Sequence, residues 1–216
     1  MIARIRVRAA TDVAMSDSFH RLIKRVTKHP HGAPEYPGPK AKAMTNVDPL
    51  GRITLLFHFT DRRNLRLIRK LGGLYPLAKL KKKEVEVPAP GGNDWSQDAD
   101  EMRGMDRYVH LCFRANHPME HLARQEGRIG DTIFLQIHPE VLQWEGVKFT
   151  PGVSNKSGVS VYSVEEAKEI IDFEVLYTRT NWRDPDIQRR LQEAEKYEIL
   201  VPKRIPLELI RNFPND

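Results

Sequence analysis

The stretch Ile53-Thr-Leu-Leu-Phe-His-Phe-Thr60 carries the clearest structural signal in the chain. Its odd positions are all apolar, and its even positions end in His58 and Thr60, which an extended backbone places on one face. This pattern predicts a buried strand over residues 53–60. The two polar side chains at its end are candidates for holding a ribose or an amide. The alternative is a histidine that only completes the hydrogen bonding at the end of the strand.

A short helix is predicted directly after this strand. Asp61 can cap its N-terminus, and Gly72-Gly73 is a typical C-terminal stop. The apolar residues between them recur at helical spacing, at Leu65, Ile68 and Leu71. Because a helix N-terminus favours phosphate, the strand, turn and helix together form a candidate nucleotide-binding unit.

A second apolar stretch, Tyr197-Glu-Ile-Leu-Val201, predicts a strand near the C-terminal end and contains one carboxylate, Glu198. Burying a charge is costly unless the charge is paired or functional. Glu198 is therefore the candidate catalytic carboxylate. The alternative is a strand edge from which Glu198 faces water.

The remaining pattern indicates an α+β fold. Alternating residues predict strands over 108–113 and 132–138, and helices are predicted to begin at Ser163 and at Asp184. Strands and helices do not alternate regularly along the chain, which argues against a parallel α/β sheet. The segment Lys79–Asp106 is poor in apolar residues and is predicted to be a long loop.

Residues 1–50 are predicted to be a basic extension with a proline-rich linker, followed by a folded domain over 51–216. Residues 1–83 contain 19 Lys or Arg against 5 Asp or Glu, and the remainder contains 16 against 24. The net charge of +6 is thus the sum of +14 and −8. A basic half of this size suits a polyanionic partner, and the alternative is a solvated basic face.

The composition is ordinary for a globular protein, with 40% hydrophobic and 30% charged residues. The single cysteine, Cys112, excludes an internal disulfide and favours a reducing compartment, so a cytoplasmic protein is predicted. No apolar run approaches the roughly 20 residues that span a bilayer, and no membrane association is predicted. The basic N-terminus also fits an organellar transit peptide, which stays an alternative.

The sequence lacks several motifs that identify common binding and catalytic sites. The chain has no GxGxxG, GxxxxGK[ST], GxSxG, HExxH or paired CxxC motif. His117 and His121 adjoin Pro118, which argues against a regular helix there, and no metal site is predicted. Cys112 lies in an apolar strand and is interpreted as a core residue, because a cysteine nucleophile would need a histidine poised in space.

Short motifs spread over roughly residues 53–210 resemble the DarT DNA ADP-ribosyltransferases. The opening motif of that family is similar to Leu56-Phe-His-Phe-Thr60, Asn64-Leu65, Ile68 and Gly73-Leu74. Its central motifs are similar to Val87-Pro88, Pro90-Gly91-Gly92, Tyr108-Val109, Phe113 and Pro118-Met119. Its C-terminal block is similar to Asp172-Phe173-Glu174, Trp182-x-Asp184-Pro185, Ala194 and Glu198-Ile-Leu-Val201. The shared order of these pieces carries the resemblance.

The resemblance implies an ADP-ribosyltransferase fold with two facing, mostly antiparallel sheets and flanking helices. It implies that NAD is a substrate bound in the cleft, without a metal, and that ADP-ribose is transferred to thymine or guanine in single-stranded DNA. The catalytic glutamate of the family falls on Glu198, and Arg103 is the candidate for its arginine, with Lys83 and Arg107 as alternatives. His58, Thr60, Asn64 and Leu65 are expected to bind NAD. A macrodomain-type antitoxin is the partner that the family implies for a toxin of a toxin–antitoxin or phage-defence system.

The chain also departs from the family. Val109-His-Leu-Cys-Phe113 replaces an aromatic-rich strand, and Asn116-His117 replaces a basic-serine pair, so the target base stays open. Trp182, Tyr177 and Tyr197 are expected to stack on bases, and Arg179 and Arg183 to meet phosphates; Trp182 is alternatively a core residue. Two other hypotheses remain, an enzyme that modifies RNA or protein and a catalytically dead nucleic-acid-binding module.

Overall fold

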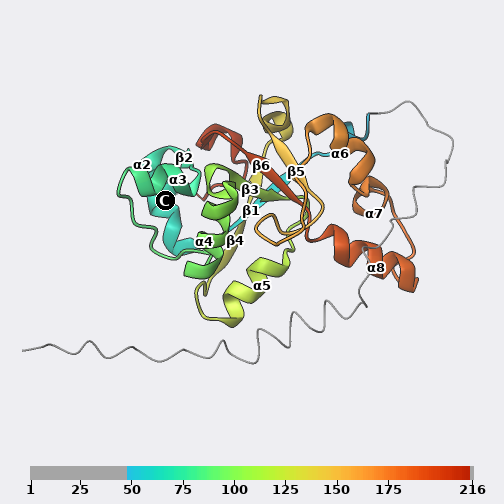
Figure 1. Ribbon diagram of the computed structural model, residues 1–216, viewed down its shortest axis with the longest axis horizontal. Coiled ribbons are helices and arrows are strands. Elements are labelled where there is room, and N and C mark those ends of the chain that lie inside the picture. Colours follow the sequence, from blue (N-terminus) through green and yellow to red (C-terminus); the bar gives the residue numbers. More distant parts are fainter. Residues whose placement is uncertain (1–47, 215–216) are drawn as a thin grey trace, which may run out of the picture. The chain divides into compact units, whose positions relative to one another are not determined.

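The computed structural model describes residues 48–214, so the predicted extension over residues 1–50 lies almost wholly outside the described residues. The centre of the fold is a five-stranded antiparallel sheet in the order β4-β1-β3-β6-β5 (Figure 1). Its strands are β1 (Leu56–Asp61), β3 (Val109–Cys112), β4 (Thr132–Ile137), β5 (Lys148–Thr150) and β6 (Glu198–Val201). A second antiparallel sheet pairs β2 (Gly73–Leu74) with β7 (Ile205–Pro206).

The four strands predicted from the sequence are confirmed as β1, β3, β4 and β6, each slightly shorter than predicted. Strands β2, β5 and β7 were not predicted. They contain only two or three residues each, which is too short for alternation to be recognised. The two antiparallel sheets and their helices confirm the α+β class.

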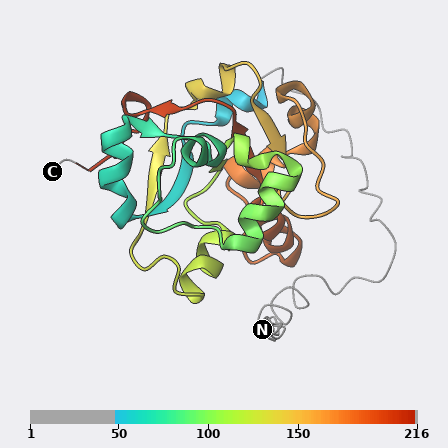
Figure 2. The same ribbon diagram turned by 60° about the vertical axis from the view of Figure 1, so that its left-hand side comes forward.

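Helices flank the large sheet on two sides. They are α2 (Leu65–Leu71), α3 (Leu77–Lys82), α4 (Asp94–Arg103), α5 (Pro118–Gln125), α6 (Val164–Ile170), α7 (Phe173–Tyr177) and α8 (Pro185–Ala194). In Figure 1 and Figure 2, α2 lies on one side of the strands and α6, α7 and α8 lie on the other. Short 3-10 helices cover Pro49–Arg52, Arg62–Asn64, Met105–Arg107, Pro139–Gln143 and Leu207–Leu209.

Most predicted helix boundaries are confirmed by their caps. The Asp61 side chain accepts from the Arg63 N–H, which starts the turn before α2, and Gly72 ends α2 with a left-handed φ of 71°. Ser163 makes both bonds of a capping box before α6. Pro185 occupies the first turn of α8.

Two sequence predictions are wrong. The segment Lys79–Asp106 is not a loop, because it contains part of α3 and all of α4. Pro118 does not exclude a helix either; it occupies the first turn of α5, where the missing N–H costs nothing. His117 caps that helix, since its Nδ1 accepts from the Met119 N–H at 3.3 Å.

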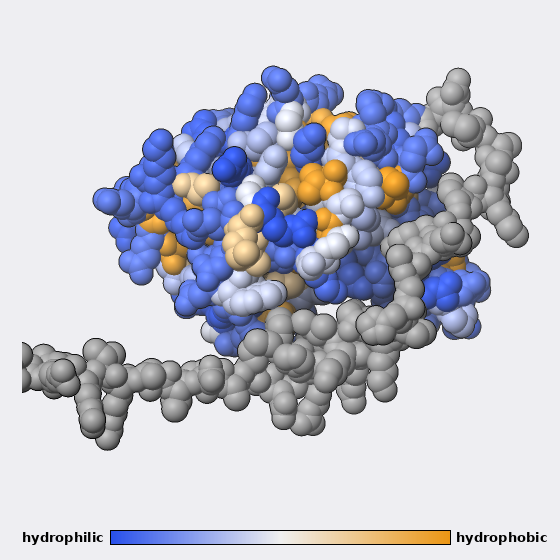
Figure 3. All heavy atoms as spheres, in the orientation of Figure 1, coloured by the Kyte–Doolittle hydropathy of each residue, from blue (hydrophilic) through white to orange (hydrophobic). Residues whose placement is uncertain are grey.

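The core lies on both faces of the large sheet. Ile199, Leu200 and Val201 are successive residues of β6 and all are fully buried, so neither face of this strand meets water. Phe149 of β5 and Leu135 of β4 extend the same core. The surface seen in Figure 3 is mainly hydrophilic, with hydrophobic side chains in small separate patches. The sheet is therefore a rigid support for side chains placed at strand ends.

Candidate active site

The central strands β1 and β3 separate just where the polar residues of β1 begin. β1 pairs with β4 over all six of its residues, but its recorded pairing with β3 is the single pair Phe57–Cys112. Beyond that pair the His58 ring enters the gap, with Nδ1 2.9 Å from the carbonyl oxygen of His110. A carbonyl oxygen only accepts, so Nδ1 carries the proton and Nε2 is left with a lone pair. Burial lowers the pKa of His58, which keeps the ring neutral.

Thr60 and Asn64 are tied to each other and to the loop before α4. The Asn64 amide donates to Thr60 Oγ1 at 3.0 Å and to the Ala89 carbonyl at 2.7 Å, and its oxygen accepts from the Ala89 N–H at 2.9 Å. Both amide hydrogens of Asn64 are thus used within the protein. Asn64 therefore positions its neighbours, and His58 and Thr60 are left as the polar groups of this strand end.

A cavity opens beside this strand end. Three of the four residues predicted to bind NAD, His58, Thr60 and Asn64, line it. Its apolar wall comes from α2, β2, α3 and the following loop, at Leu67, Ile68, Leu71, Leu74, Leu80 and Val87. Leu65 is partly buried and is not among the lining residues. An apolar wall with a few polar groups at one end suits one part of a ligand, such as a planar ring with a polar edge.

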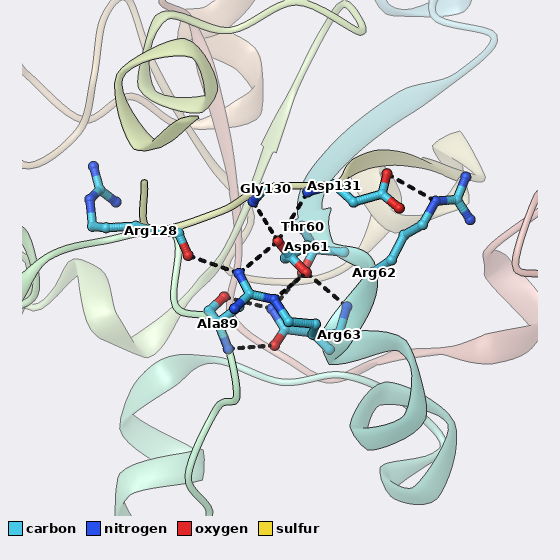
Figure 4. A network of polar contacts seen from close by, with 9 residues as sticks. Thr60, Asp61, Arg62, Arg63, Ala89, Arg128, Gly130 and Asp131 are labelled. Atoms are coloured by element: carbon cyan, nitrogen blue, oxygen red, sulfur yellow. Dashed lines mark hydrogen bonds and ion pairs between the residues drawn. The ribbon is translucent and has the colours of Figure 1, made fainter. Parts of the chain in front are cut away.

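Asp61 fixes the turn that follows (Figure 4). One of its oxygens accepts from the Arg63 N–H and guanidinium, at 2.8 Å each, and the other accepts from Arg63 Nη2 and from the N–H groups of Gly130 and Asp131. The Arg63 guanidinium and these N–H groups hold the pKa of Asp61 far below its ordinary value. The network joins the start of α2 to the segment before β4. It therefore secures the cavity wall.

Glu198 is the first residue of β6 and is 5% exposed, so the alternative of a water-facing edge position is excluded. Its Oε2 lies 3.2 Å from His110 Nδ1 and accepts from the Ser154 N–H at 3.2 Å. Its Oε1 lies 3.7 Å from His117 Nε2. Burial alone would raise the pKa of Glu198, but the hydrogen bond and charge of His110 hold it below the ordinary value. The buried carboxylate is therefore ionised near neutral pH.

The pKa of His110 is shifted in the opposite direction, upward. Burial opposes its charged form, but the hydrogen bond to Glu198 and the negative charge there raise the pKa of His110 to about 9. Its Nε2 lies 3.0 Å from the Met105 carbonyl oxygen. The site thus contains an ion pair between β3 and β6, held inside the protein.

His58 and Glu198 are joined through His110 and not by direct contact. The His110 carbonyl binds the His58 ring, and the His110 ring binds the Glu198 carboxylate. The cavity beside His58 does not include Glu198 in its lining. His58 and Glu198, the two site residues predicted from the sequence, are therefore linked through a single residue, His110. They lie on either side of the place where β1 and β3 separate.

Arg103 lies at the end of α4, and its guanidinium is engaged by the loop after β5. It donates to the carbonyl oxygens of Lys156 and Val159 at 2.6 Å each. That loop carries Ser154, whose N–H contacts Glu198. In this arrangement Arg103 positions the loop. Lys83 and Arg107 are the alternatives for the arginine of the family. Lys83 lies over the Tyr75 ring at 4.9 Å, and Tyr75 lines the cavity. Arg107 is exposed.

Of the aromatic residues expected to stack on bases, the two tyrosines pack with the core and the tryptophan is exposed. Tyr197 is buried and packs edge-on against Phe113, so the prediction that it stacks on a base is wrong. Tyr177 is partly buried and stacks on Phe173, and its contact with a base stays a prediction. Trp182 is 67% exposed, which excludes the alternative of a core position, and the Arg183 guanidinium lies over its ring at 5.3 Å.

Cys112 is 4% exposed in β3, and burial strongly raises the pKa of its thiol. The interpretation as a core residue is confirmed, since a thiol in this environment is a poor nucleophile.

Three residues near Glu198 were not predicted from the sequence. His110 and Ser154 contact its carboxylate, and Asp100 of α4 lies near His110 with its Oδ1 buried and without a hydrogen-bond partner. Burial raises the pKa of Asp100 to about 6. The only signal available in the sequence was that His110 and His117 stand where the chain departs from the family pattern.

Within residues 48–214, no group of three His, Cys, Asp or Glu side chains is arranged to hold a metal ion. Over the same residues, every helix is too short or too polar to cross a membrane.

Comparison with known proteins gives one family and several structures. A family model described as "ssDNA thymidine ADP-ribosyltransferase, DarT" matches residues 57–213. The structure of Thermus sp. 2.9 DarT in complex with ADP-ribosylated ssDNA superposes with a TM-score of 0.53 at 20% identity, covering 73% of this chain and 79% of that one. Thermosipho africanus DarTG in complex with ADP-ribose gives a TM-score of 0.53 at 16% identity, covering 73% of this chain and 42% of that one. No curated protein sequence matches the chain at a significant level. The two structures share the fold described above.

Proposed function

The chain belongs to the DarT family of ssDNA thymidine ADP-ribosyltransferases, and on this premise we propose that Glu198 is the carboxylate that drives transfer of ADP-ribose from NAD to a DNA base. The family confirms the sequence prediction of an NAD-dependent enzyme that acts on single-stranded DNA. The observation that supports the role of Glu198 is its burial as an ionised group on the strand next to His110. Burying a charge in this way is costly, which favours a functional reason for it.

The transfer breaks the bond between the ribose and nicotinamide and forms a bond from the same ribose carbon to a nitrogen of the base. Positive charge develops on the ribose during this exchange, and nicotinamide leaves with the electron pair of the broken bond. A carboxylate beside the ribose stabilises that charge more in the transition state than in the ground state. We assign this role to Glu198, and we assign to it the proton that the base nitrogen loses.

One part of NAD is proposed to enter the cavity beside β1, with the rest of the molecule outside it. His58 Nε2 faces the substrate side as an acceptor for a ribose hydroxyl, because Nδ1 is engaged by His110. Thr60 offers a hydroxyl on the same strand, and the apolar wall suits a planar ring. Asn64 supports this end of β1 through its hydrogen bond to Thr60, and Leu65 supports it by packing against the core. Lys83, over Tyr75 at the cavity, is the cation we assign to the pyrophosphate, while Arg103 holds the loop that carries Ser154.

The DNA strand is proposed to pass over the turn before α8. Trp182 and Arg183 present an exposed ring with a stacked guanidinium, a pair suited to a base and its phosphate. An exposed Arg179 lies earlier in the same segment between α7 and α8. An enzyme that modifies a base atom needs an unstacked nucleotide, which agrees with a single-stranded substrate. We assign thymidine as the acceptor base, as in the family's description, with guanine as the alternative.

A macrodomain-type antitoxin is proposed as the biological partner, with the chain acting as the toxin of a toxin–antitoxin or phage-defence system. The support is the sequence resemblance together with the shared fold of DarTG. The cytoplasm is proposed as the location, since the one cysteine forms no disulfide.

The function is tested by incubating the purified chain with labelled NAD and one acceptor at a time. Acceptors are a thymine-containing single strand, the same strand without thymine, its duplex, RNA of the same sequence and protein. Label is expected on the first alone. Binding to that strand should also weaken steeply as salt rises from 50 to 200 mM, because phosphate contacts release counterions. Label on RNA or protein instead of DNA would contradict the proposal, and labelling of the thymine-free strand would point to guanine.

A further inference from the structure

We infer that His110 is a positioning residue that holds one oxygen of Glu198 as an imidazolium and thereby leaves the other oxygen for the substrate. This inference rests on the proposed catalytic role of Glu198. It assigns a function to a residue that has none in the mechanism above.

The partners of the His110 ring require two protons on it. Nδ1 lies 3.2 Å from Glu198 Oε2 and Nε2 lies 3.0 Å from the Met105 carbonyl oxygen. An ionised carboxylate and a carbonyl only accept hydrogen bonds, so both ring nitrogens must donate. The nearby Ser154 hydroxyl, at 3.4 Å from Nδ1, is compatible with this state because it can accept as well as donate.

The two oxygens of Glu198 are used differently. Oε2 receives both hydrogen bonds, from the His110 ring and from the Ser154 N–H. Oε1 accepts no hydrogen bond from residues 48–214, and His117 Nε2, at 3.7 Å, is too distant to donate one. His117 Nδ1 accepts from the Met119 N–H, so the His117 proton is on Nε2. Oε1 is therefore the oxygen left to receive a substrate hydroxyl or the proton of the base.

The same residue also reaches the other end of the site. The His110 carbonyl accepts from the His58 ring at 2.9 Å, so one residue of β3 sets both the NAD-binding histidine and the carboxylate. Displacing β3 would move both groups together. The contact to His58 is made by the backbone carbonyl and is kept when the His110 side chain is exchanged, so such a variant should change the rate more than the binding of NAD.

The charges around His110 come from four elements. Glu198 of β6 and Asp100 of α4 favour its charged form, and the charge of His110 in turn lowers the pKa of His58 of β1 and the pKa of His117 before α5. Asp100 is itself near Arg103 and Asp106, which act on it in opposite directions. With the pKa of His110 raised to about 9, the imidazolium persists through neutral pH and is lost above it.

The experiment combines ring titration with kinetics. In the wild-type protein, NMR should find one histidine ring that is doubly protonated at pH 7.5 and titrates near pH 9. The signal of this ring should be absent in His110→Gln. In Glu198→Gln this titration should fall toward its ordinary value of about 6.5. His121→Gln, which changes an exposed histidine of α5, is the matched control and should leave the titration unchanged.

In kinetics, wild-type kcat is expected to fall above about pH 9. His110→Gln keeps a donor but cannot titrate, so its kcat should be about tenfold lower at pH 7.5 and lack the alkaline fall, with the KM for NAD little changed. An ordinary titration of His110 in the wild type, or an alkaline fall that persists in His110→Gln, would overturn the inference. If the wild-type protein transferred nothing to any acceptor, the proposed function would fail, and the ring titration would still decide the state of His110.

Discussion

Glu198 of β6 is the register partner of Cys112 of β3, and Cys112 is in turn paired with Phe57 of β1. This row across the sheet marks the last point at which β1 and β3 stay together. The carboxylate is therefore placed beside the opening between the two central strands, where a substrate can reach residues of both. The backbone register, set by a buried sheet, fixes this position more firmly than a loop would.

The buried thiol in this row gives a first prediction. Cys112→Ala should keep kcat/KM for transfer within about threefold, because a residue that is not a nucleophile leaves the chemistry intact. It should destabilise the fold by about 1 kcal/mol through the lost buried sulfur. The measurement is transfer to a single-stranded oligonucleotide together with urea denaturation. Loss of transfer with a retained fold would give Cys112 a chemical role that its raised pKa argues against.

The Asp61 network predicts a stability that depends on pH. Asp61→Asn should lower the free energy of unfolding by about 2 kcal/mol at pH 7, since hydrogen bonds to a charged group are lost. The folded pKa of Asp61 lies below its ordinary 3.8, so this stabilisation is present above pH 3.8 and is lost as the pH falls below it. The difference between wild type and variant in urea denaturation should therefore begin to shrink near pH 4 and keep shrinking as the pH falls below 3.

Asp131→Asn is the control for that experiment. Asp131 pairs with Arg62 on the surface, with 73% of its side chain exposed, so its removal should change stability by less than about 0.5 kcal/mol. Equal effects of Asp61→Asn and Asp131→Asn would mean that Asp61 does not anchor the turn.

Gly73 gives a prediction for the small sheet. Its φ is +147°, and an added Cβ would lie 2.0 Å from the Ile205 carbonyl oxygen across the β2–β7 pair. Gly73→Ala should therefore cost about 3 kcal/mol or more by forcing the two strands apart. Gly51→Ala is the matched control, because no atom lies within 4 Å of a Cβ there and little change is expected. Urea denaturation of both variants makes the comparison, and equal stability would show that β2 and β7 do not require this close contact.

The main strands and the ends of the site could be predicted because their signals are local. A histidine and a carboxylate inside apolar stretches are visible in the sequence, and capping residues mark the turns beside them. The contacts of Glu198 could not be predicted in the same way. Which side chains reach it depends on the register of β3 against β6 and on the path of the loop after β5, and a single sequence does not contain that information.

The missed helix α4 has a different cause. It exposes Trp95 and Met102, at 60% and 88%, and buries Ser96. Its pattern of apolar and polar residues is thus the reverse of the one that identifies an amphipathic helix. The helix is defined by its caps, Asn93 and Gly104, and by Arg103, which holds the loop against it.

The role of Glu198 is tested most directly by comparing Glu198→Gln with wild type in transfer from NAD to a thymine-containing single strand, followed by mass spectrometry of the oligonucleotide. The substitution preserves shape and removes the charge that stabilises the ribose cation. Glu193→Gln, which changes an exposed glutamate of α8, is the matched control. We expect the rate to fall about 1000-fold in Glu198→Gln and to stay within about twofold in Glu193→Gln, with both proteins folded. A Glu198→Gln protein that adds ADP-ribose at the wild-type rate would contradict the account.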